Sequence, residues 1–285
     1  MNGLCGIWGQ PYIDLSEHID TSGFDALDRE IGLGLCEIEP SYTGGSLKWM
    51  GVVAPWVERD PYRDYGRVIR ELSAADFSDF ISLAEDPERF DIDPSDLQRR
   101  AEYEFGDETD HPLSRRQMLY LKYRHGVYFP WQVCYHFLEN ERWDDKHSGH
   151  GKAFEPEAEA LFPKTVAFIR SLPFVEIGRA VLFGLDANDH APAHRDSEPG
   201  VSLEVAQSIS FDPRGNKRFY VCDPENRART VVDSRIYWFN DMDYHGVEPD
   251  PFFRYSIRID GVFDRDFIRR LSPPRINPPG RGSAR

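Results

Sequence analysis

The second half of the chain is a succession of short strand-like segments separated by turns. The segments are rich in β-branched and aromatic residues, and turn-forming stretches such as Asp212-Pro213-Arg214-Gly215-Asn216 lie between them. We expect strands at Phe174–Leu185, Ala193–Asp196, Val205–Phe211, Lys217–Cys222, Thr230–Val232, Ile236–Phe239, His245–Val247 and Phe253–Val262. Strands of this length and spacing predict a mainly β core, a double-stranded β-helix or jelly roll, with flanking helices.

Three ligand-type residues within this strand series can meet in one site. His194 and Asp196 are two residues apart on an expected strand, so their side chains point to the same side. His245 lies on a later strand, which can return beside the first. Two imidazoles and one carboxylate on one face of a metal leave the opposite positions open, as in the sites of non-haem Fe(II) oxygenases.

The last expected strand carries a further polar set. Arg254 and Ser256 share one face of it, where a guanidinium and a hydroxyl could grip a carboxylate. Arg258 lies on the same face and competes with Arg254 for that role. A lone His-x-Asp, or a solitary His, is common in proteins without a metal. The combination of all these residues at this spacing is rarer and favours the metal site.

Two stretches of the chain resemble the Fe(II)/2-oxoglutarate-dependent oxygenases, most closely the aspartyl/asparaginyl β-hydroxylase-like (cupin-type) branch. They are LFGLDANDHAPAHRDS (Leu182–Ser197) and YWFNDMDYHGVEPDPFFRYSIRIDGVF (Tyr237–Phe263). The resemblance covers roughly the last 110 residues. It implies Fe(II) bound by His194, Asp196 and His245, with 2-oxoglutarate and O₂ as cosubstrates. It also implies Arg254 and Ser256 on the far carboxylate of 2-oxoglutarate. Gln207 stands near the position where this branch often has a basic residue that helps to hold the cosubstrate.

The resemblance implies hydroxylation of the β-carbon of an amino-acid side chain within a peptide. A free amino acid or a small natural product is the alternative substrate. Asp196 occupies the position that halogenating relatives leave to a small residue, so hydroxylation is favoured over halogenation. A non-catalytic, metal-binding cupin-like protein is a rival reading, against which Arg254 argues. A metallohydrolase is a second rival interpretation. The sequence argues against it, because it contains no HExxH or comparable motif.

Residues 1–150 are expected to form an α/β elaboration packed on the core, 151–271 the β-helix itself and 272–285 a flexible tail. We expect helices over Tyr65–Leu72, after the capping segment at Ser73, over Arg115–Arg124 and over Glu157–Leu172; a start at Phe162-Pro163 is the alternative for the last one. Leu47–Val57 is expected to be extended, and Gly32-Leu33-Gly34-Leu35 to be a turn or strand end.

The segment Tyr128–Trp143 is crowded with aromatic residues and leads into a polar loop that ends at Gly151. The aromatics could belong to the core, or they could form a substrate-facing wall with Trp131 or Trp143 at the active-site mouth. In the second case the acidic residues of this region would favour a neutral or cationic peptide. These acidic residues are Glu139, Glu141, Asp144 and Asp145. His147 and His150 have no further ligand beside them and are expected to be surface histidines.

Composition and charge indicate which partners and compartments to expect. The net charge is −15, from 34 basic and 49 acidic residues, which disfavours nucleic acid as a partner. No apolar run is long enough to span a bilayer, and the first residues lack the features of a signal peptide. The cysteines Cys5, Cys36, Cys134 and Cys222 are scattered, as is typical of reduced thiols. We therefore expect a cytoplasmic protein with a peptide or small-molecule substrate and no membrane partner.

Overall fold

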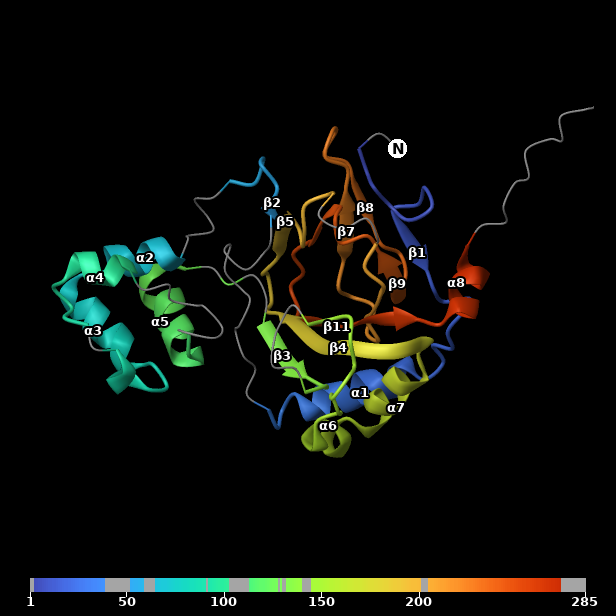
Figure 1. Ribbon diagram of the computed structural model, residues 1–285, viewed down its shortest axis with the longest axis horizontal. Helices are drawn as coiled ribbons and strands as arrows, with labels where there is room; N and C mark the ends of the chain where they lie inside the picture. Colours follow the sequence, from blue (N-terminus) through green and yellow to red (C-terminus); the bar gives the residue numbers. More distant parts are fainter. Residues whose placement is uncertain are drawn as a thin grey trace, which may run out of the picture.

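Two antiparallel β-sheets form the centre of the molecule (Figure 1). The computed structural model describes residues 3–38, 52–58, 65–90, 92–102, 113–127, 129, 132–139, 145–200 and 205–272. In these ranges a six-stranded sheet has the order β1 (Tyr12–Asp14), β9 (Ile236–Phe239), β6 (Ser208–Phe211), β11 (Arg254–Phe263), β4 (Phe174–Leu185) and β3 (Gln132–His136). A five-stranded sheet has the order β2 (Val52–Val53), β5 (Ala191–Arg195), β10 (Tyr244–Val247), β7 (Phe219–Cys222) and β8 (Arg229–Val231).

The alternation of side chains along β11 separates a helix-covered face from an inner face. Tyr255, Ile257 and Ile259 join the main hydrophobic core on one side of the six-stranded sheet. Ser256, Arg258 and Asp260 are also buried, and by the same alternation they point to the opposite side. The side of the six-stranded sheet that carries Ser256, Arg258 and Asp260 faces the five-stranded sheet, because both sheets contribute to a shared apolar cluster. Its members are Leu185, Ala191, Phe219, Val221, Val232, Tyr237, Phe239 and Val247. Charged residues therefore lie inside a two-sheet sandwich.

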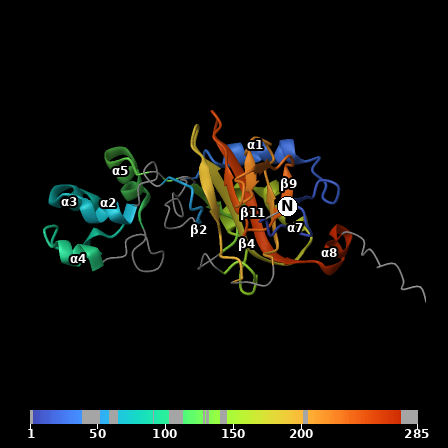
Figure 2. The ribbon, with the colours of Figure 1, turned by 90° about the horizontal axis from the view of Figure 1, so that it is seen from above.

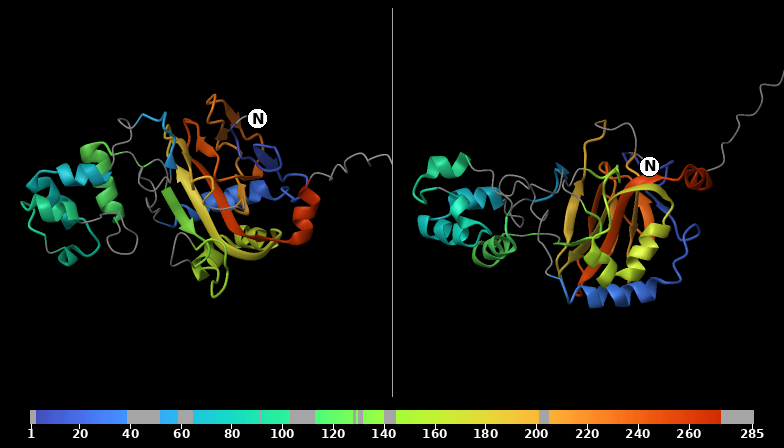
Figure 3. Two further views of the ribbon diagram at one scale, coloured as in Figure 1. Left: turned by 45° about the horizontal axis from the view of Figure 1, so that its top comes forward. Right: turned by 60° about the horizontal axis from the view of Figure 1, so that its bottom comes forward.

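Helices cover the outer face of the six-stranded sheet. α1 (Phe24–Gly34) and α7 (Pro163–Ser171) lie side by side there, with α6 (Pro156–Leu161) next to α7 (Figure 3). A Cβ at Gly34 would lie 2.1 Å from the Phe162 ring, so glycine lets the end of α1 approach this ring. The expectation of a turn or strand end at Gly32–Leu35 is therefore wrong, because both glycines lie in the last turn of α1, where Gly34 packs against Phe162.

The segment between β2 and β3 forms a helical lobe beside the sheets (Figure 2). It contains α2 (Tyr65–Glu71), α3 (Ala74–Ser82), the 3-10 turn η1 (Pro87–Arg89), α4 (Leu97–Glu102) and α5 (Arg115–His125). Helices α2, α3 and α5 share their own apolar cluster. Local signals set the ends of these helices. Ser73 caps α3, Ser114 and Gln117 form a capping box on α5, and Gly126 ends α5 with φ 64°.

The mainly β core with flanking helices is confirmed, and each expected strand segment contains a strand. β4 and β9 have the expected bounds, and the others differ only at their ends. The structure differs over the first 150 residues, because β1, β2, β3 and α1 from that part belong to the sheets and their cover. The last helix is α8 (Arg265–Leu271), and of the expected tail only Ser272 lies within the described residues. None of the described helices has the length and apolar character needed to cross a membrane.

Candidate metal centre

The pairing of β5 with β10 brings the two histidines together. His194 and His245 are direct partners in this ladder, and the centroids of their rings lie 4.4 Å apart. Asp196 follows the end of β5, and its Oδ1 lies 3.9 Å from His194 Nε2 and 3.4 Å from His245 Nε2. One ligand atom from each residue lies within 4.8 Å of the others. The structure thus assembles the three residues that the sequence predicts as metal ligands.

Backbone carbonyls fix the orientation of both imidazoles. His194 Nδ1 lies 2.8 Å from the carbonyl of Pro192, and His245 Nδ1 lies 2.9 Å from the carbonyl of Asp243. A carbonyl only accepts hydrogen bonds, so in a neutral ring Nδ1 carries the proton and donates it, and Nε2 keeps its lone pair. Both lone pairs then face Asp196 Oδ1, as metal-binding histidines require.

Burial and charge set the protonation of the site. Burial, and then the neighbouring His245, lowers the pKa of His194 to about 3, so this ring is neutral at physiological pH. Burial acts to raise the pKa of Asp196, but Arg258 and the two imidazoles outweigh it and hold that pKa well below its usual range. The Asp196 side chain is 31% exposed, whereas His194 and His245 are buried. The site is therefore reached from solvent on the Asp196 side.

Arg258 connects the candidate ligand Asp196 to two further carboxylates. Its Nη1 donates to Asp196 Oδ2 at 2.8 Å, its Nη2 to Asp241 Oδ2 at 3.0 Å and its Nε to Asp260 Oδ1 at 2.9 Å. Because Asp196 Oδ2 is engaged in this way, Oδ1 is the oxygen that faces the histidines.

Two more cations complete this network. Arg179 binds Asp260 at 2.7 Å, and Lys146 binds Asp241 at 3.1 Å. The three cations and three carboxylates balance in charge, which makes their joint burial tolerable. We call this set the ionic network: Lys146, Arg179, Asp196, Asp241, Arg258 and Asp260.

The loop between β9 and β10 supports two of the candidate ligands. The backbone N–H of Asp196 donates to the carbonyl of Asp241 at 2.9 Å, and the carbonyl of Asp243 holds the His245 ring. The Asp243 carboxylate in turn accepts hydrogen bonds from the backbone N–H groups of Cys5 and Gly6, at 2.6 and 2.7 Å. Residues near the start of the chain thus help to position His245.

The Arg254–Ser256 pair lies farther along the inner face of β11. Arg254 is fully buried, and its Nη2 and Nη1 donate to the carbonyls of Asp189 (2.6 Å) and Asp250 (3.3 Å). Ser256 Oγ accepts a hydrogen bond from the amino group of Lys217, which precedes β7. The structure therefore adds a lysine to the predicted arginine and serine.

Gln207 lies at the other end of β11. Its carbonyl accepts from the N–H of Gly261 at 3.1 Å, and its side-chain oxygen accepts from the N–H of Phe263 at 2.5 Å. The Gln207 side chain is thus engaged with the strand end opposite Arg254.

Residues of the aromatic segment Tyr128–Trp143, and of the loop after it, contact different parts of the fold. Phe129 packs in the helical lobe, and Phe137 packs in the main core. From the loop, Lys146 reaches the ionic network, whereas His147 and His150 are exposed. Asp145 forms an ion pair with Lys152 at 3.1 Å, and Glu139 is exposed. The remaining residues that were considered for substrate contact lie outside the described ranges: Trp131, Glu141, Trp143 and Asp144.

No family model and no curated protein matches this sequence. Among solved structures, the chain is similar to a 2OG-Fe(II) oxygenase family oxidoreductase from Burkholderia pseudomallei (11% identity, TM-score 0.30, 46% of this chain and 68% of that one). It is also similar to a prolyl-4-hydroxylase from Pseudomonas putida (8%, TM-score 0.26, 37% and 65%). A third match is a Trichoplax adhaerens prolyl hydroxylase bound to a hypoxia inducible factor peptide fragment (12%, TM-score 0.29, 48% and 74%). TM-scores this low do not establish a shared fold.

Sequence reasoning did not identify Lys217 and Asp241 as members of the site. The sequence predicts Lys217 only as the start of a strand, and nothing in its neighbourhood marks a partner on β11. Asp241 lies in the motif Asn240-Asp241-Met242-Asp243, four residues before His245, where a turn is the simplest interpretation. The alternation of Ser256, Arg258 and Asp260 was visible in the sequence and does indicate a charged inner face.

Proposed function

We propose that the chain is an Fe(II)/2-oxoglutarate-dependent oxygenase that hydroxylates its substrate, built on a double-stranded β-helix core. The observation that carries this proposal is the convergence of His194 Nε2, His245 Nε2 and Asp196 Oδ1 within 4.8 Å at one end of the sandwich. Two imidazole nitrogens and one carboxylate oxygen form a donor set that suits Fe(II) and leaves coordination positions open for a cosubstrate and O₂. The residues present therefore fit the metal.

The inner face of the sandwich also suits a dicarboxylate cosubstrate. Beyond the ligand cluster, β11 carries Ser256 and Arg254, and Lys217, in the segment before β7, donates to Ser256. A carboxylate enters an apolar interior only where such cationic groups replace its hydration. Bound Fe(II), with 2-oxoglutarate and O₂, would supply the oxidation that converts a C–H bond to an alcohol, with succinate and CO₂ as coproducts. We leave Gln207 out of this site, since its side chain is engaged at the opposite end of β11.

The protein's own residues orient and shield the reacting groups. The carbonyls of Pro192 and Asp243 hold the imidazoles, and Arg258 keeps Asp196 ionised with one oxygen toward them. The rings of Phe219 and Phe239 lie 5.6 and 4.8 Å from the His245 ring, centroid to centroid, and exclude water from that side. Such a dry wall strengthens the electrostatic interactions of the site.

For the substrate we propose the β-carbon of an amino-acid side chain in a peptide, with a free amino acid or small natural product as the alternative. The partly exposed Asp196 marks the side from which such a substrate would approach. The charge argument for a cationic peptide is weaker than the sequence suggests. Asp145 is engaged with Lys152, and Lys146 contributes a cation, not an acid, to the ionic network.

The test is succinate release after anaerobic loading with Fe(II) and 2-oxoglutarate, measured against a library of peptides and small molecules. We expect the wild-type protein to bind 2-oxoglutarate only with the metal present, and His245→Ala to lose metal-dependent turnover. Metal binding without any binding of 2-oxoglutarate would instead identify a non-catalytic metal-binding protein. Turnover that survives in His245→Ala would refute the assigned ligand set.

A further inference from the structure

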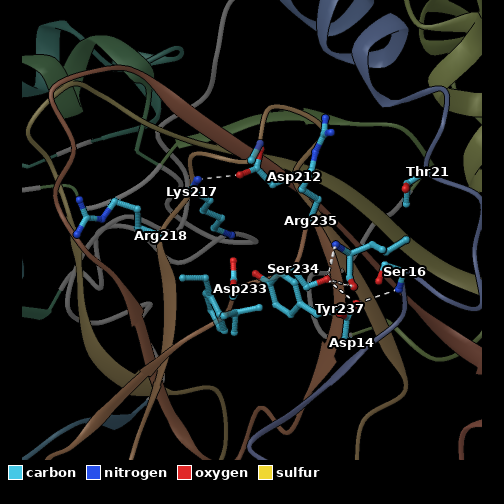
Figure 4. Close-up of a pocket in the computed structure, with 14 residues that line it drawn as sticks. Asp14, Ser16, Thr21, Asp212, Lys217, Arg218, Asp233, Ser234, Arg235 and Tyr237 are labelled. Atoms are coloured by element: carbon cyan, nitrogen blue, oxygen red, sulfur yellow. Dashed lines mark hydrogen bonds between the residues drawn. The ribbon is translucent and has the colours of Figure 1, made fainter.

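A pocket of about 290 Å³ opens at the side of the sandwich, between the β1–β9 edge of one sheet and the β7–β8 edge of the other (Figure 4). Its outer rim includes Asp14 and Asp233. At its inner end Lys217 points in from one side and Tyr237 from the other. None of the three candidate metal ligands lines it. The pocket is therefore an opening separate from the solvent-exposed side of Asp196.

Strand pairing shows how close this pocket comes to the metal centre. Phe219 lines the pocket and pairs with Val247 on β10. Val247 lies two residues beyond His245, or about 7 Å along the strand. The Phe219 ring lies 5.6 Å from the His245 ring, centroid to centroid. One side chain, that of Phe219, thus contacts both the pocket and a candidate metal ligand.

The opposite wall of the pocket leads to the ionic network. Tyr237 on β9 pairs with Ser210 on β6, and Ser210 pairs with Arg258 on β11. Side chains of directly paired residues point to the same face of a sheet, so these three all face the interior of the sandwich. Arg258 in turn contacts Asp196. The inner end of the pocket therefore faces the same interior as the metal centre.

Lys217 connects the pocket with this interior. Its amino group is buried, which lowers the pKa of Lys217 to about 8, and it donates to Ser256 Oγ on the inner face of β11. The residue as a whole is only half-buried, because the pocket exposes the rest of its side chain. A side chain that is exposed along its stem and bonded inside the sandwich at its tip follows the path between the two regions.

The charges around the pocket balance. Three carboxylates and three cations line it: Asp14, Asp212, Asp233, Lys217, Arg218 and Arg235. The two oxygens of Asp212 accept the N–H groups of Gly215 and Lys217, at 2.9 and 2.7 Å, so the turn before β7 holds this carboxylate. The Tyr237 hydroxyl is buried and has no hydrogen-bond partner among the described residues, so it can donate to a passing oxygen. Such a lining suits a small polar anion that passes without being held.

We propose that this pocket is a side passage through which the dicarboxylate cosubstrate enters and its succinate coproduct leaves, while the Asp196 side serves the substrate. The inference rests on the proposed function, which places the far carboxylate of the cosubstrate near Ser256 and Lys217, at the inner end of the pocket. A cosubstrate that enters here moves toward the metal with its 2-oxo acid end first and its far carboxylate last. A substrate bound at the Asp196 side then does not block the exchange.

Asp233 is the residue at which the passage can be obstructed. It is exposed on the outer rim, and its carboxylate has no hydrogen bond or ion pair in the part of the chain that the structure describes. Asp233→Cys introduces a thiol that benzyl methanethiosulfonate converts to a bulky mixed disulfide after the protein has folded, and a reductant removes the adduct. Wild-type protein treated in the same way controls for modification of the exposed Cys5 and Cys36.

The measurement is the exchange of radiolabelled 2-oxoglutarate on protein loaded with Mn(II), a redox-inert replacement for Fe(II). Rapid filtration gives the dissociation rate and calorimetry gives the dissociation constant. We expect the adduct on Asp233→Cys to slow association and dissociation on the order of 10-fold each, with the dissociation constant changed by less than about 2-fold. An obstacle in a passage changes the rates in both directions equally, and reduction of the adduct should restore them.

Two further variants separate bulk in the passage from other effects. Asp233→Asn removes the charge without adding bulk and should slow neither rate. Lys164→Cys carries the same adduct at an exposed position on α7, on the helix-covered face of the six-stranded sheet, and should also exchange 2-oxoglutarate at the wild-type rate.

The outcomes distinguish this inference from the function on which it rests. Unchanged rates in modified Asp233→Cys would show that 2-oxoglutarate exchanges by another route, so the passage would be wrong and the proposed function would stand. A weaker affinity with an unchanged association rate would mean that the adduct disturbs the binding site, which also contradicts the passage. If wild-type protein with Mn(II) does not bind 2-oxoglutarate at all, the proposed function itself fails.

Discussion

At the scale of single residues, Arg258 is the side chain on which the candidate metal centre most depends. It engages Asp196, Asp241 and Asp260 at once. Removing it would free the Asp196 carboxylate to turn and would leave Asp241 and Asp260 with less positive charge beside them.

We expect Arg258→Met to weaken Mn(II) binding by about 10-fold to 100-fold, as is typical when a group that orients a metal ligand is lost. Titration calorimetry measures the Mn(II) affinity. Arg258→Lys should restore part of it, because a lysine returns the positive charge but cannot contact all three carboxylates as the guanidinium does. Mn(II) affinity equal to that of the wild type in Arg258→Met would show that Asp196 needs no such support.

The pKa of Lys217 gives a second expectation at this scale. This pKa is lowered from 10.5 to about 8, so the amino group is charged below that pH and increasingly neutral above it. The charged groups that act on it are Asp212, Arg254 and Arg258, and Tyr237 remains neutral.

Binding of 2-oxoglutarate should therefore weaken as the pH rises through about 8, and binding above that pH should be accompanied by proton uptake. Calorimetry in buffers of different ionisation enthalpy measures this uptake. Lys217→Arg should remove the pH dependence in this range, since a guanidinium keeps its charge. A wild-type affinity that stays constant from pH 7 to pH 9.5 would speak against Lys217 as the binding group.

At the scale of secondary-structure elements, the sequence is informative where a local signal decides the outcome. β4 and β9 have the expected bounds because each is a dense run of strand-forming residues, and α3 and α5 begin at side-chain caps. The end of α1 was missed because Gly34 lies where Phe162 approaches the helix too closely for a side chain, and no local pattern shows this contact.

The distinction between local signals and tertiary packing also applies to the candidate site. His194, Asp196 and His245 could be predicted because strand periodicity and spacing suffice to place them on adjacent strands. The bond from Lys217 to Ser256 depends on how the two sheets stack, so it could not be predicted from spacing. Arg254 is expected at the cosubstrate from the strand face that it shares with Ser256, whereas its hydrogen bonds to the carbonyls of Asp189 and Asp250 depend on the loops around it and could not be predicted.

The segment around Cys5 and Gly6 supports an element-scale prediction. In Asp243→Asn one oxygen acceptor becomes an NH₂ group that faces a backbone N–H, so one of these two hydrogen bonds is lost. We expect Tm to fall by about 2–6 °C, from a loss of about 1–2 kcal/mol, together with weaker Mn(II) binding. Ser22→Ala, in another loop near the start of the chain, is the control and should change neither quantity. Lower stability with unchanged Mn(II) affinity would separate this segment from the metal centre.

At the scale of the whole molecule, the helical lobe and the sandwich have separate hydrophobic cores. Phe80 is fully buried in the lobe and belongs to no cluster of the sandwich. We expect Phe80→Ala to cost about 3–5 kcal/mol of stability in the lobe and to leave Mn(II) affinity intact. Limited proteolysis should then cut within residues 65–127 first. A parallel loss of Mn(II) binding would show that the lobe and the metal centre fold as one unit.

The ionic network also has a consequence for how such a chain can evolve. Arg258 serves three carboxylates, so a substitution at any one of them leaves a buried charge unbalanced, whereas matched changes at several positions preserve neutrality. Descendants of a common ancestor should then keep Arg179, Asp241, Arg258 and Asp260 together or exchange them together. This joint conservation should be detectable in an alignment of homologous sequences even where their overall identity is low. It would identify true relatives better than the His-x-Asp motif alone.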